Sequence, residues 1–352
     1  MFNIIIKNGR IVDGSGNPWF KADVAIEDGK IAEIGALAYE SADRVIDASN
    51  LVVSAGWIDI HDHSELSLLA NPRADSKIRQ GVTTEVNGNC GVSPAPGRPS
   101  GWVEDINRLG INMDWKTLEG YLARLEKQGV SENVATCVGH ANIRLCVMTD
   151  ASKKTTAEEL EKMKVLVAEA MEDGAFGLSA DLCSYPGAFA DKNELVELCK
   201  IVAKYHGLYL PDQRGYDVAG GTSLNIEDAA RESIEIAEEA GLPVHISHFH
   251  MRYPGGKSRL LLQMVDDARK RGVDVTFDVV VPEPGPSNVP IDMREGYHWG
   301  ESRLSRQFVP YAVYEGGIEK IIETLRDPKM REKFKREHVP HWKVQLTGNW
   351  DS

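Results

Sequence analysis

The sequence predicts an α/β fold, a parallel (β/α) barrel with seven recognisable strands that follows a small all-β unit. From about residue 55 onward, apolar strands alternate with amphipathic helical patterns, which is typical of parallel strands joined by helical crossovers. The preceding residues show short strands and turn signals without a helical period. The length of 352 residues is sufficient for one large barrel. We therefore divide the chain into a small all-β part at 1–54, a barrel at 55–280 and a third segment at 281–352.

The N-terminal unit is predicted from its turn residues and its short β-rich runs. Asp28-Gly29 is a favoured tight-turn pair and joins two of the runs in a hairpin. The expected strands of this unit lie at 3–7, 23–27, 30–34, 45–47 and 51–53.

The barrel elements are predicted from apolar runs and helical periodicity. The segment 158–167 has the apolar spacing of a half-buried helix, and Asp191 and Asn225 stand where N-caps are expected. The expected strands lie near 57–61, 83–87, 134–138, 175–179, 207–211, 243–247 and 273–279. The expected helices lie near 116–128, 156–173, 191–205, 226–240 and 258–271.

Beyond residue 280 the alternation of strands and helices stops. The proline-rich run 281–286 cannot continue a strand or a helix. Helical patterns near 315–325 and 328–336 and a candidate strand at 342–346 follow it, and none of them is an eighth barrel strand. We therefore expect a barrel that lacks its last strand in this chain.

Charge and cysteine content restrict the class of protein. The net charge of −13, from 40 basic and 53 acidic residues, argues against nucleic acid or an anionic membrane as a partner. The apolar run at the N-terminus is too short for a signal peptide, and no stretch approaches the length of a membrane span. Five scattered cysteines suit free thiols in a reducing compartment. We expect a cytoplasmic protein.

The most informative motif is the apolar run 57–60 that leads into His61-Asp62-His63. Successive side chains of a strand point to opposite faces, so His61 and His63 are expected to point to the same side. Two neighbouring imidazoles at a strand end are suited to be the first two ligands of a metal ion. The alternative is a pair of hydrogen-bonded surface histidines, because a His-x-His motif alone is a weak signal.

Chemically active side chains recur at the carboxyl ends of the predicted strands, where the active site of a parallel barrel lies. They are His61, His63, Cys90, His140, Asp181, Asp212, Arg214, His245, His248, His250 and Asp278. Imidazoles, a thiol and carboxylates form the ligand set of a zinc site. The barrel would bring these distant residues together at one end.

Each candidate has a structural alternative. Cys90 is either a small buried hydrophobe or, because glycines flank its loop, a thiol held at a backbone turn. His140 is expected to orient another group instead of binding metal. His245 has the opposite strand parity to His248 and is expected to face the helices. Asp278 is a candidate for accepting backbone amides at its strand end.

Together these motifs resemble those of the N-acyl-D-amino-acid deacylases (D-aminoacylases) of the amidohydrolase superfamily, over essentially the whole chain. The motifs are the run 6–16, the run 56–63, Gly88-Asn89-Cys90-Gly91, Gly139-His140 with Arg144, the run 174–179, Tyr185-Pro186-Gly187 and Ile246-Ser247-His248. The His-x-His pair with a cysteine in an Asn-Cys-Gly loop separates this family from relatives that use a carbamylated lysine.

The resemblance implies a TIM-like (β/α) barrel and a centre of one or two zinc ions. It also implies that 1–54 is part of a small β-sandwich and that 281–352 is a lid-like insertion. Carried over residue by residue, it assigns metal ligation to His61, His63, Cys90 and His248. Asp212 stands in the place of a family histidine and is expected as a further ligand, although it is shorter and adds negative charge beside the thiolate.

The resemblance also implies substrate contacts. Arg144, Arg214 and Tyr185 are candidates for holding a substrate carboxylate, which a guanidinium binds well through paired hydrogen bonds. His250 stands where the family has a lysine that resembles a substrate contact. The family's catalytic aspartate lies on the eighth strand, which this chain is expected to lack, and Asp278 is a weak stand-in for it.

Two functions of different kinds follow from the resemblance. The first is a zinc-dependent hydrolase that cleaves the amide of N-acyl-D-amino acids, or a related amide, to a carboxylate and a D-amino acid. The second is a truncated or inactive family member that binds metal or a partner chain without turnover. Because an open barrel exposes strand edges, we also expect a homo-oligomer.

Overall fold

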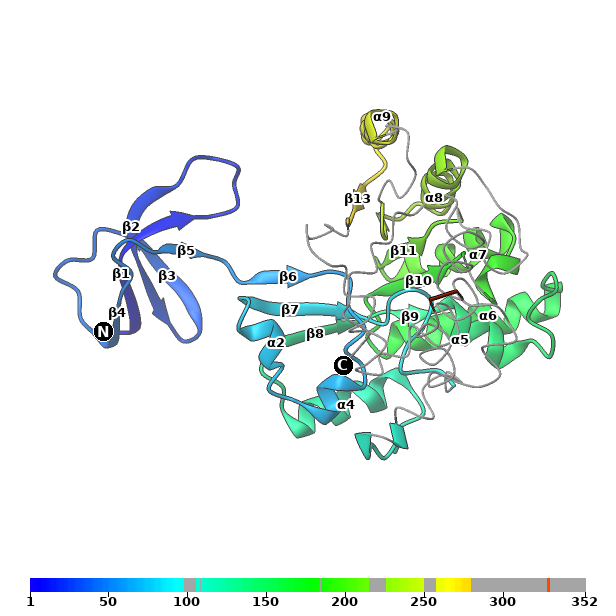
Figure 1. Cartoon of the computed structure of the whole chain (residues 1–352), viewed down its shortest axis with the longest axis horizontal. Coiled ribbons are helices and arrows are strands. Elements are labelled where there is room, and N and C mark those ends of the chain that lie inside the picture. The colour runs from blue at the N-terminus through cyan, green and yellow to red at the C-terminus, as the bar shows by residue number, and fades with distance from the viewer. Residues whose placement is uncertain are drawn as a thin grey trace. The chain divides into compact units, whose positions relative to one another are not determined.

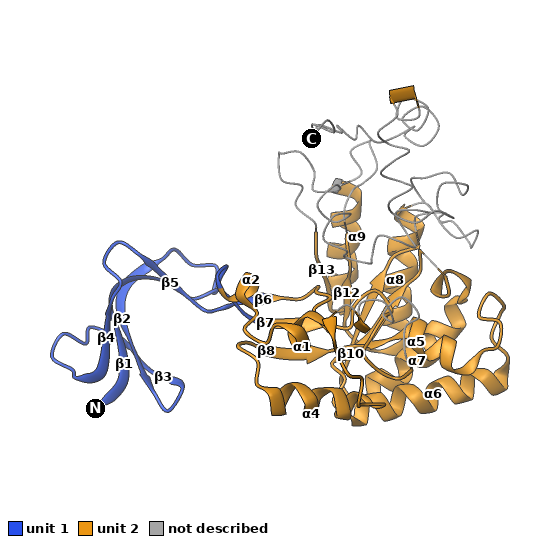
Figure 2. Ribbon diagram, turned by 60° about the horizontal axis from the view of Figure 1, so that its bottom comes forward, with its two compact units in different colours: residues 1–58, 79–83 blue, residues 59–78, 84–352 orange. Residues whose placement is uncertain are grey.

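The computed structural model describes residues 1–97, 106–107, 109–183, 185–214, 226–249, 258–279 and 328–329. It divides into two compact units, shown in two colours in Figure 2. The first contains Met1–Ile58 and Arg79–Thr83, and the second contains Asp59–Ile78 and the chain from Thr84 onward. The elements expected at 315–325 and 342–346, nearly all of 328–336, the run 281–286 and the N-cap Asn225 lie outside the described residues.

The first unit contains a five-stranded sheet in the order β3-β2-β1-β4, in which β5 also pairs with β1. Its strands are β1 (Phe2–Val12), β2 (Phe20–Glu27), β3 (Lys30–Gly35), β4 (Ala42–Asp47) and β5 (Val52–Ser54). The predicted hairpin is confirmed, because Asp28 and Gly29 have φ angles of 51° and 73° and the flanking β2 and β3 pair antiparallel. Ile5, Ala25 and Leu37 form its small buried cluster.

The predicted series of parallel strands is confirmed in the remainder of the fold. The strands are β6 (Trp57–Asp59), β7 (Val82–Asn87), β8 (Asn133–Thr136), β9 (Val138–Gly139), β10 (Gly177–Asp181), β11 (Leu208–Asp212), β12 (Val244–Ile246) and β13 (Val275–Phe277). One sheet has the order β13-β12-β11-β10-β9, with each neighbouring pair parallel, and the other has the order β6-β7-β8. The strand expected at 134–138 is divided into β8 and β9 at Cys137.

Helices follow the strands and cover their outer side, as Figure 1 shows for α6, α7 and α8. The helices are α1 (Ser67–Ala70), α2 (Asp75–Ile78), α4 (Leu118–Gln128), α5 (His140–Val147), α6 (Ala157–Glu172), α7 (Lys192–Lys204), α8 (Ile226–Ala240) and α9 (Ser258–Lys270), with a 3₁₀ turn η1 (Gly187–Phe189). The helices α1, α2 and α5 were not predicted. The predicted N-cap Asp191 is confirmed, and Thr156 begins α6 with a capping box.

The main core lies between the parallel strands and these helices. Leu178 of β10, Tyr209 of β11 and Val244 of β12 are fully buried, and they belong to one cluster with Leu195 of α7 and Ile234 of α8. Burying side chains of this size stabilises the fold by about 1.5–3 kcal/mol each. This packing fixes the strand ends, and the loops that leave the carboxyl ends therefore start from a rigid base.

Candidate metal centre

The segment that carries His61 and His63 continues from β6 and is held by polar side chains. The Nζ atom of Lys77 lies between the carboxylates of Asp59 and Asp62 and pairs with both. The Nδ2 atom of Asn89 donates to the carbonyl oxygen of Val86 at 2.8 Å and approaches those of Ile60 and Asp62 at 3.4 Å. The two histidines are therefore presented by a braced segment and not by a free strand end.

The loop that carries Cys90 depends on glycine. Gly88 has a φ of +75°, and a Cβ atom there would lie 2.3 Å from the carbonyl oxygen of Cys137. Cys90 itself has a φ of 50°, a left-handed conformation that is uncommon for residues other than glycine and that clusters at functional sites. The Ser179 hydroxyl donates to the Gly88 carbonyl at 2.5 Å and accepts from the Gly91 amide at 3.0 Å. The tight turn is therefore held from β10.

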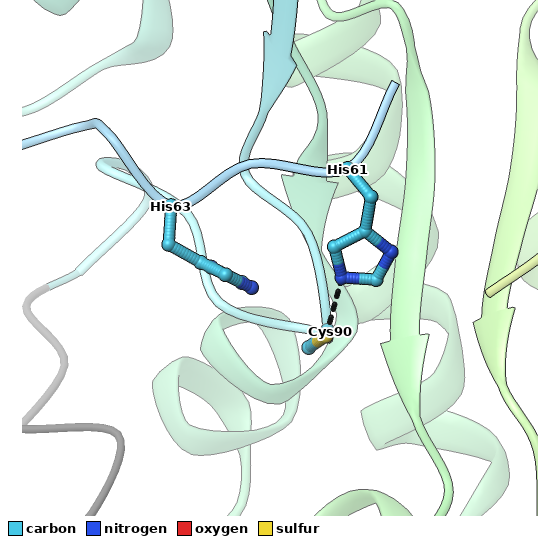
Figure 3. Close-up of side chains that lie close together, drawn as sticks. All are labelled: His61, His63 and Cys90. Atoms are coloured by element: carbon cyan, nitrogen blue, oxygen red, sulfur yellow. Dashed lines mark hydrogen bonds between the residues drawn. The ribbon is translucent and has the colours of Figure 1, made fainter. Parts of the chain in front are cut away.

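The predicted metal ligands come together around the Cys90 thiol. The Nε2 atom of His61 lies 3.1 Å from Sγ of Cys90, and Nε2 of His248 lies 4.0 Å from the same sulfur. Figure 3 shows His61, His63 and Cys90 side by side, with the dashed line joining His61 to the thiol. The ligand atoms of His61, His63 and Cys90 lie within 4.8 Å of one another, and so do those of Cys90, Asp212 and His248.

Two further strand ends complete the centre. Asp212 ends β11 and is buried, and its bridge to Ser247 places it beside the turn that carries His248. His248 has a φ of 52°, so this residue, like Cys90, stands in a left-handed turn beyond its strand. Its backbone amide donates to Oδ1 of Asp278 at 2.9 Å.

Asp278 has more partners than the sequence suggested. Its Oδ2 atom accepts from Nδ1 of His61 at 2.9 Å and from Nε2 of His245 at 3.3 Å. Burial would raise the pKa of Asp278, but the hydrogen bonds from His245 and His61 outweigh it and hold the pKa well below its usual range. Both carboxylate oxygens of Asp278 already accept hydrogen bonds from histidines, so the geometry does not support Asp278 as the stand-in proton shuttle.

The expectation that His245 faces the helices is wrong. Its Nδ1 atom lies 2.8 Å from the Thr276 hydroxyl, and its Nε2 atom contacts Asp278 at the metal centre. The parity argument fails because β12 ends at Ile246, and His248 lies beyond it in a turn where strand alternation no longer applies.

Buried acidic residues lie behind the histidine segment. Glu65 accepts a 2.6 Å hydrogen bond from the Gly88 amide, and its Oε1 atom lies 3.9 Å from Nδ1 of His63. Burial raises the pKa of Glu65 to about 8. Burial, followed by the charge of Asp62, raises the pKa of Glu85 to about 8. The sequence analysis did not identify these two glutamates, because glutamate side chains are most often exposed to solvent.

The expected substrate contacts have different outcomes. Arg144 is fully buried and binds Glu194, Thr155 and two backbone carbonyls, so the structure does not support a substrate contact there. Arg214 is 3% exposed and binds Glu232 and the carbonyl oxygens of Ala188 and Ala190, which holds η1 in place instead. The side chain of Tyr185 is 48% exposed and remains available. His250 lies outside the described residues.

His140 orients another group, as the sequence analysis expected, but not at the metal centre. It is the first residue of α5, and its Nε2 atom lies 2.7 Å from Oε1 of Glu194 on α7. Both side chains are buried. This histidine therefore belongs to the same structural network as Arg144.

The donor set fits zinc on chemical grounds. Imidazole nitrogens, one thiolate and one carboxylate are the ligand types that Zn²⁺ takes in proteins, and a catalytic zinc needs three or four of them. The distances between the ligand atoms are short enough for one ion to contact several of them. The cysteine and histidine rule against a site built for Mg²⁺ or Ca²⁺, which prefer oxygen ligands.

Comparison with known proteins identifies deacylases with similar sequences. Curated relatives include an N-acyl-D-glutamate deacylase and a D-aminoacylase of Alcaligenes xylosoxydans xylosoxydans, 36% and 34% identical to this chain. The aligned regions cover 83% and 79% of this chain, but 59% and 57% of those relatives. The chain thus spans less than two thirds of the length of these relatives.

Solved structures show the same likeness. The N-acyl-D-glutamate deacylase of Bordetella bronchiseptica, determined with zinc and a phosphonate inhibitor, superimposes with a TM-score of 0.72 at 35% identity, over 83% of this chain and 61% of that one. A D-aminoacylase studied for its binuclear metal centre superimposes with a TM-score of 0.71 at 32% identity, over 79% of this chain and 58% of that one.

Two further findings bear on the class of protein. In the described part of the chain, no helix combines the length and apolarity needed to cross a membrane. The sequence of this chain matches the amidohydrolase family over residues 44–346, which is most of its length. This chain therefore belongs to the amidohydrolase family.

Proposed function

We propose that this chain is a zinc-dependent amidohydrolase that hydrolyses the amide of N-acyl-D-amino acids to a carboxylate and a free D-amino acid. The observation that carries the proposal is the convergence of His61, His63, His248 and Asp212 on the Cys90 thiol. The names of the similar deacylases support the substrate class.

The residues of the centre have defined roles in this proposal. His61, His63, Cys90 and His248 would hold the metal, with Asp212 as a further ligand. When bound, zinc supplies Lewis-acid polarisation of a carbonyl oxygen and acidifies water. Ser179 and Asn89 hold the Cys90 loop and the histidine segment in place, and Tyr185 is the exposed side chain proposed to contact substrate.

A second function is favoured by one specific observation. The carboxylate of Asp278 is occupied by hydrogen bonds from histidines and has a lowered pKa, so it is unsuited to move a proton. A chain without another proton shuttle would bind metal, or a partner chain, without turnover. The experiment below separates this alternative from the enzyme.

The test measures zinc per chain by elemental analysis in purified protein, together with release of D-amino acid from N-acetyl-D-glutamate, N-acetyl-D-aspartate and N-acetyl-D-leucine. The variant is Cys90→Ser, and the matched control is Cys146→Ser, because Cys146 is an exposed cysteine away from the donor set. We expect about one zinc per chain, lost in Cys90→Ser and kept in the control, and turnover of D but not L substrates. Zinc without turnover would favour the second function, and absence of zinc after loading would refute the enzyme and the metal-binding form of the second function.

We further propose a cytoplasmic, self-associating protein. Among the strands that the structure describes, β13 and β6 stand at the ends of their sheet orders, and a strand edge without a partner strand tends to pair with other chains. A single monomeric species in light scattering across a range of concentrations would argue against self-association.

A further inference from the structure

One carboxylate, that of Asp278, hydrogen-bonds three histidines, two through their rings and one through its backbone amide. Oδ2 of Asp278 accepts from the ring nitrogens of His61 and His245, and Oδ1 accepts the backbone amide of His248. The side chain of Asp278 is 15% exposed, so water competes little for its oxygens. Asp278 follows β13, whereas His61 follows β6 and His248 follows β12.

The hydrogen bond to Asp278 determines which nitrogen of His61 can bind a metal. A carboxylate only accepts, so the proton lies on Nδ1 of His61, which leaves the lone pair of Nε2 free. That Nε2 atom is the one that lies 3.1 Å from the Cys90 sulfur. The pair of contacts therefore runs from the carboxylate through the imidazole to the thiol.

His248 is oriented in the same sense. Its Nε2 atom lies on the side of the Cys90 sulfur, at 4.0 Å, whereas its Nδ1 atom lies 3.6 Å from Oδ1 of Asp278. The rings of His61 and His248 stack with their centroids 4.2 Å apart and an angle of 31°. Both rings therefore direct Nε2 toward the thiol and Nδ1 toward the same carboxylate.

His245 holds that carboxylate from a third direction. The Thr276 hydroxyl lies 2.8 Å from Nδ1 of His245, and Nε2 of His245 faces Asp278. With the proton of the neutral ring on Nε2, His245 accepts from Thr276 and donates to Asp278. The orientation of Asp278 is therefore determined by His245 on the neighbouring strand β12, without help from a metal.

We propose that Asp278 is a positioning residue that fixes the tautomer and direction of the metal-ligating His61 imidazole and holds the turn that carries His248, with His245 as its support. This proposal rests on the proposed metal centre and deepens it. Carboxylates that accept from the distal nitrogen of a metal-bound histidine raise its basicity and hold its ring, and their removal typically weakens metal binding by about 10–100-fold.

The test compares zinc affinity, from competition with a chromophoric chelator, in wild type, Asp278→Ala, Asp278→Asn and Asp274→Asn. Asp274 is an exposed carboxylate on the same segment, so Asp274→Asn matches the change in charge without touching the centre. We expect about a 10–100-fold loss in Asp278→Ala, a smaller loss in Asp278→Asn because its amide oxygen accepts one hydrogen bond, and no change in the control.

A second readout separates positioning from ligation by Asp278 itself. His61, His248 and Asp278 also form a group whose ligand atoms lie within 4.8 Å of one another. Cobalt substitution in the wild type should produce a thiolate-to-cobalt absorption band, absent in Cys90→Ser and retained in Asp278→Ala with a weaker affinity. A wild type that binds cobalt without the thiolate band would place the metal at Asp278 and overturn the proposal.

The support from His245 gives an independent check if Asp278→Ala does not fold. His245→Gln keeps a donor toward Asp278 and should bind zinc more tightly than His245→Ala, which removes it. Zinc affinities of Asp278→Asn and His245→Ala within twofold of wild type would refute the positioning role while leaving the metal centre intact. A wild type that binds no zinc would refute the proposed function as well.

Discussion

Glu194 is buried against Arg144 and His140, and we expect the substitution Glu194→Gln to lower the stability of this fold strongly. Glu194 and Arg144 are 2% and 0% exposed, and the Glu194 carboxylate also accepts from Thr155. Burial would raise the pKa of Glu194, but hydrogen bonding to His140 and the charges of His140 and Arg144 lower it from 4.5 to about 2. One pKa unit equals about 1.36 kcal/mol, so the shift corresponds to about 3 kcal/mol of stability.

The glutamine variant keeps the shape of the side chain but turns a donor toward the Arg144 guanidinium and removes its counter-charge. Breaking a buried pair on one side costs about 3–5 kcal/mol, in agreement with the value from the pKa. The matched control is Glu197→Gln on the same helix. Hydrogen bonds from Lys164 and Lys200 also lower the pKa of Glu197 to about 2, but these ion pairs lie at the helix surface, where solvent screens them and such pairs contribute only about 0–1 kcal/mol.

The assay is urea unfolding of both variants and wild type at pH 7 and at steps down to pH 3. A carboxylate with a depressed pKa in the folded state stabilises the fold above its unfolded pKa of about 4.5, and that stability is lost as the pH falls toward about 2. The difference between wild type and Glu194→Gln should therefore shrink below pH 5. A loss at pH 7 no larger than that of the control would refute the reasoning.

Three further substitutions test the support of the site and of its helices. Ser179→Ala should destabilise the fold by about 1–3 kcal/mol, because it leaves the buried Gly88 carbonyl and Gly91 amide without their hydroxyl partner; urea unfolding and zinc affinity should both report it. Gly88→Ala should reduce soluble yield and zinc content, because the new methyl group would clash with the backbone of Cys137. The control is Gly129→Ala, where φ is similar at +76° but the space around the new methyl group is open, so equal effects of the two variants would contradict the clash. Thr156→Ala should lower the thermal midpoint through a loss of about 1 kcal/mol, because it removes the hydrogen bond that the Thr156 hydroxyl accepts from the Glu159 amide in the capping box of α6.

The alternation of strands and helices, and most of the proposed ligand set, were predictable from the sequence. His61, His63 and Cys90 lie in short motifs that can be recognised from the sequence. The carboxyl ends of the strands lie at the same end of the fold because parallel strands share a direction. The sequence analysis therefore placed these residues correctly near one another before any packing was known.

The roles that depend on packing were not predictable. Arg144 and Arg214 were expected to meet a substrate, but both are buried in ion pairs with glutamates of other helices. His245 was assigned by counting alternation along a strand that ends at Ile246, one residue later. In each case a long-range partner, Glu194, Glu232 or Asp278, decides the direction of the side chain, and single-sequence patterns carry no information about such partners.

The hydrogen bond between His61 and Asp278 has a consequence for the order in which the centre assembles. The two residues are 217 positions apart in the chain. At a synthesis rate of about 5–20 residues per second, His61 would leave the ribosome roughly 10–45 seconds before Asp278. A metal ion that bound the nascent chain in this interval would be coordinated by imidazoles and a thiol before the carboxylate that orients the imidazole had been synthesised. Metal capture should therefore be a late event, coupled to the docking of β13.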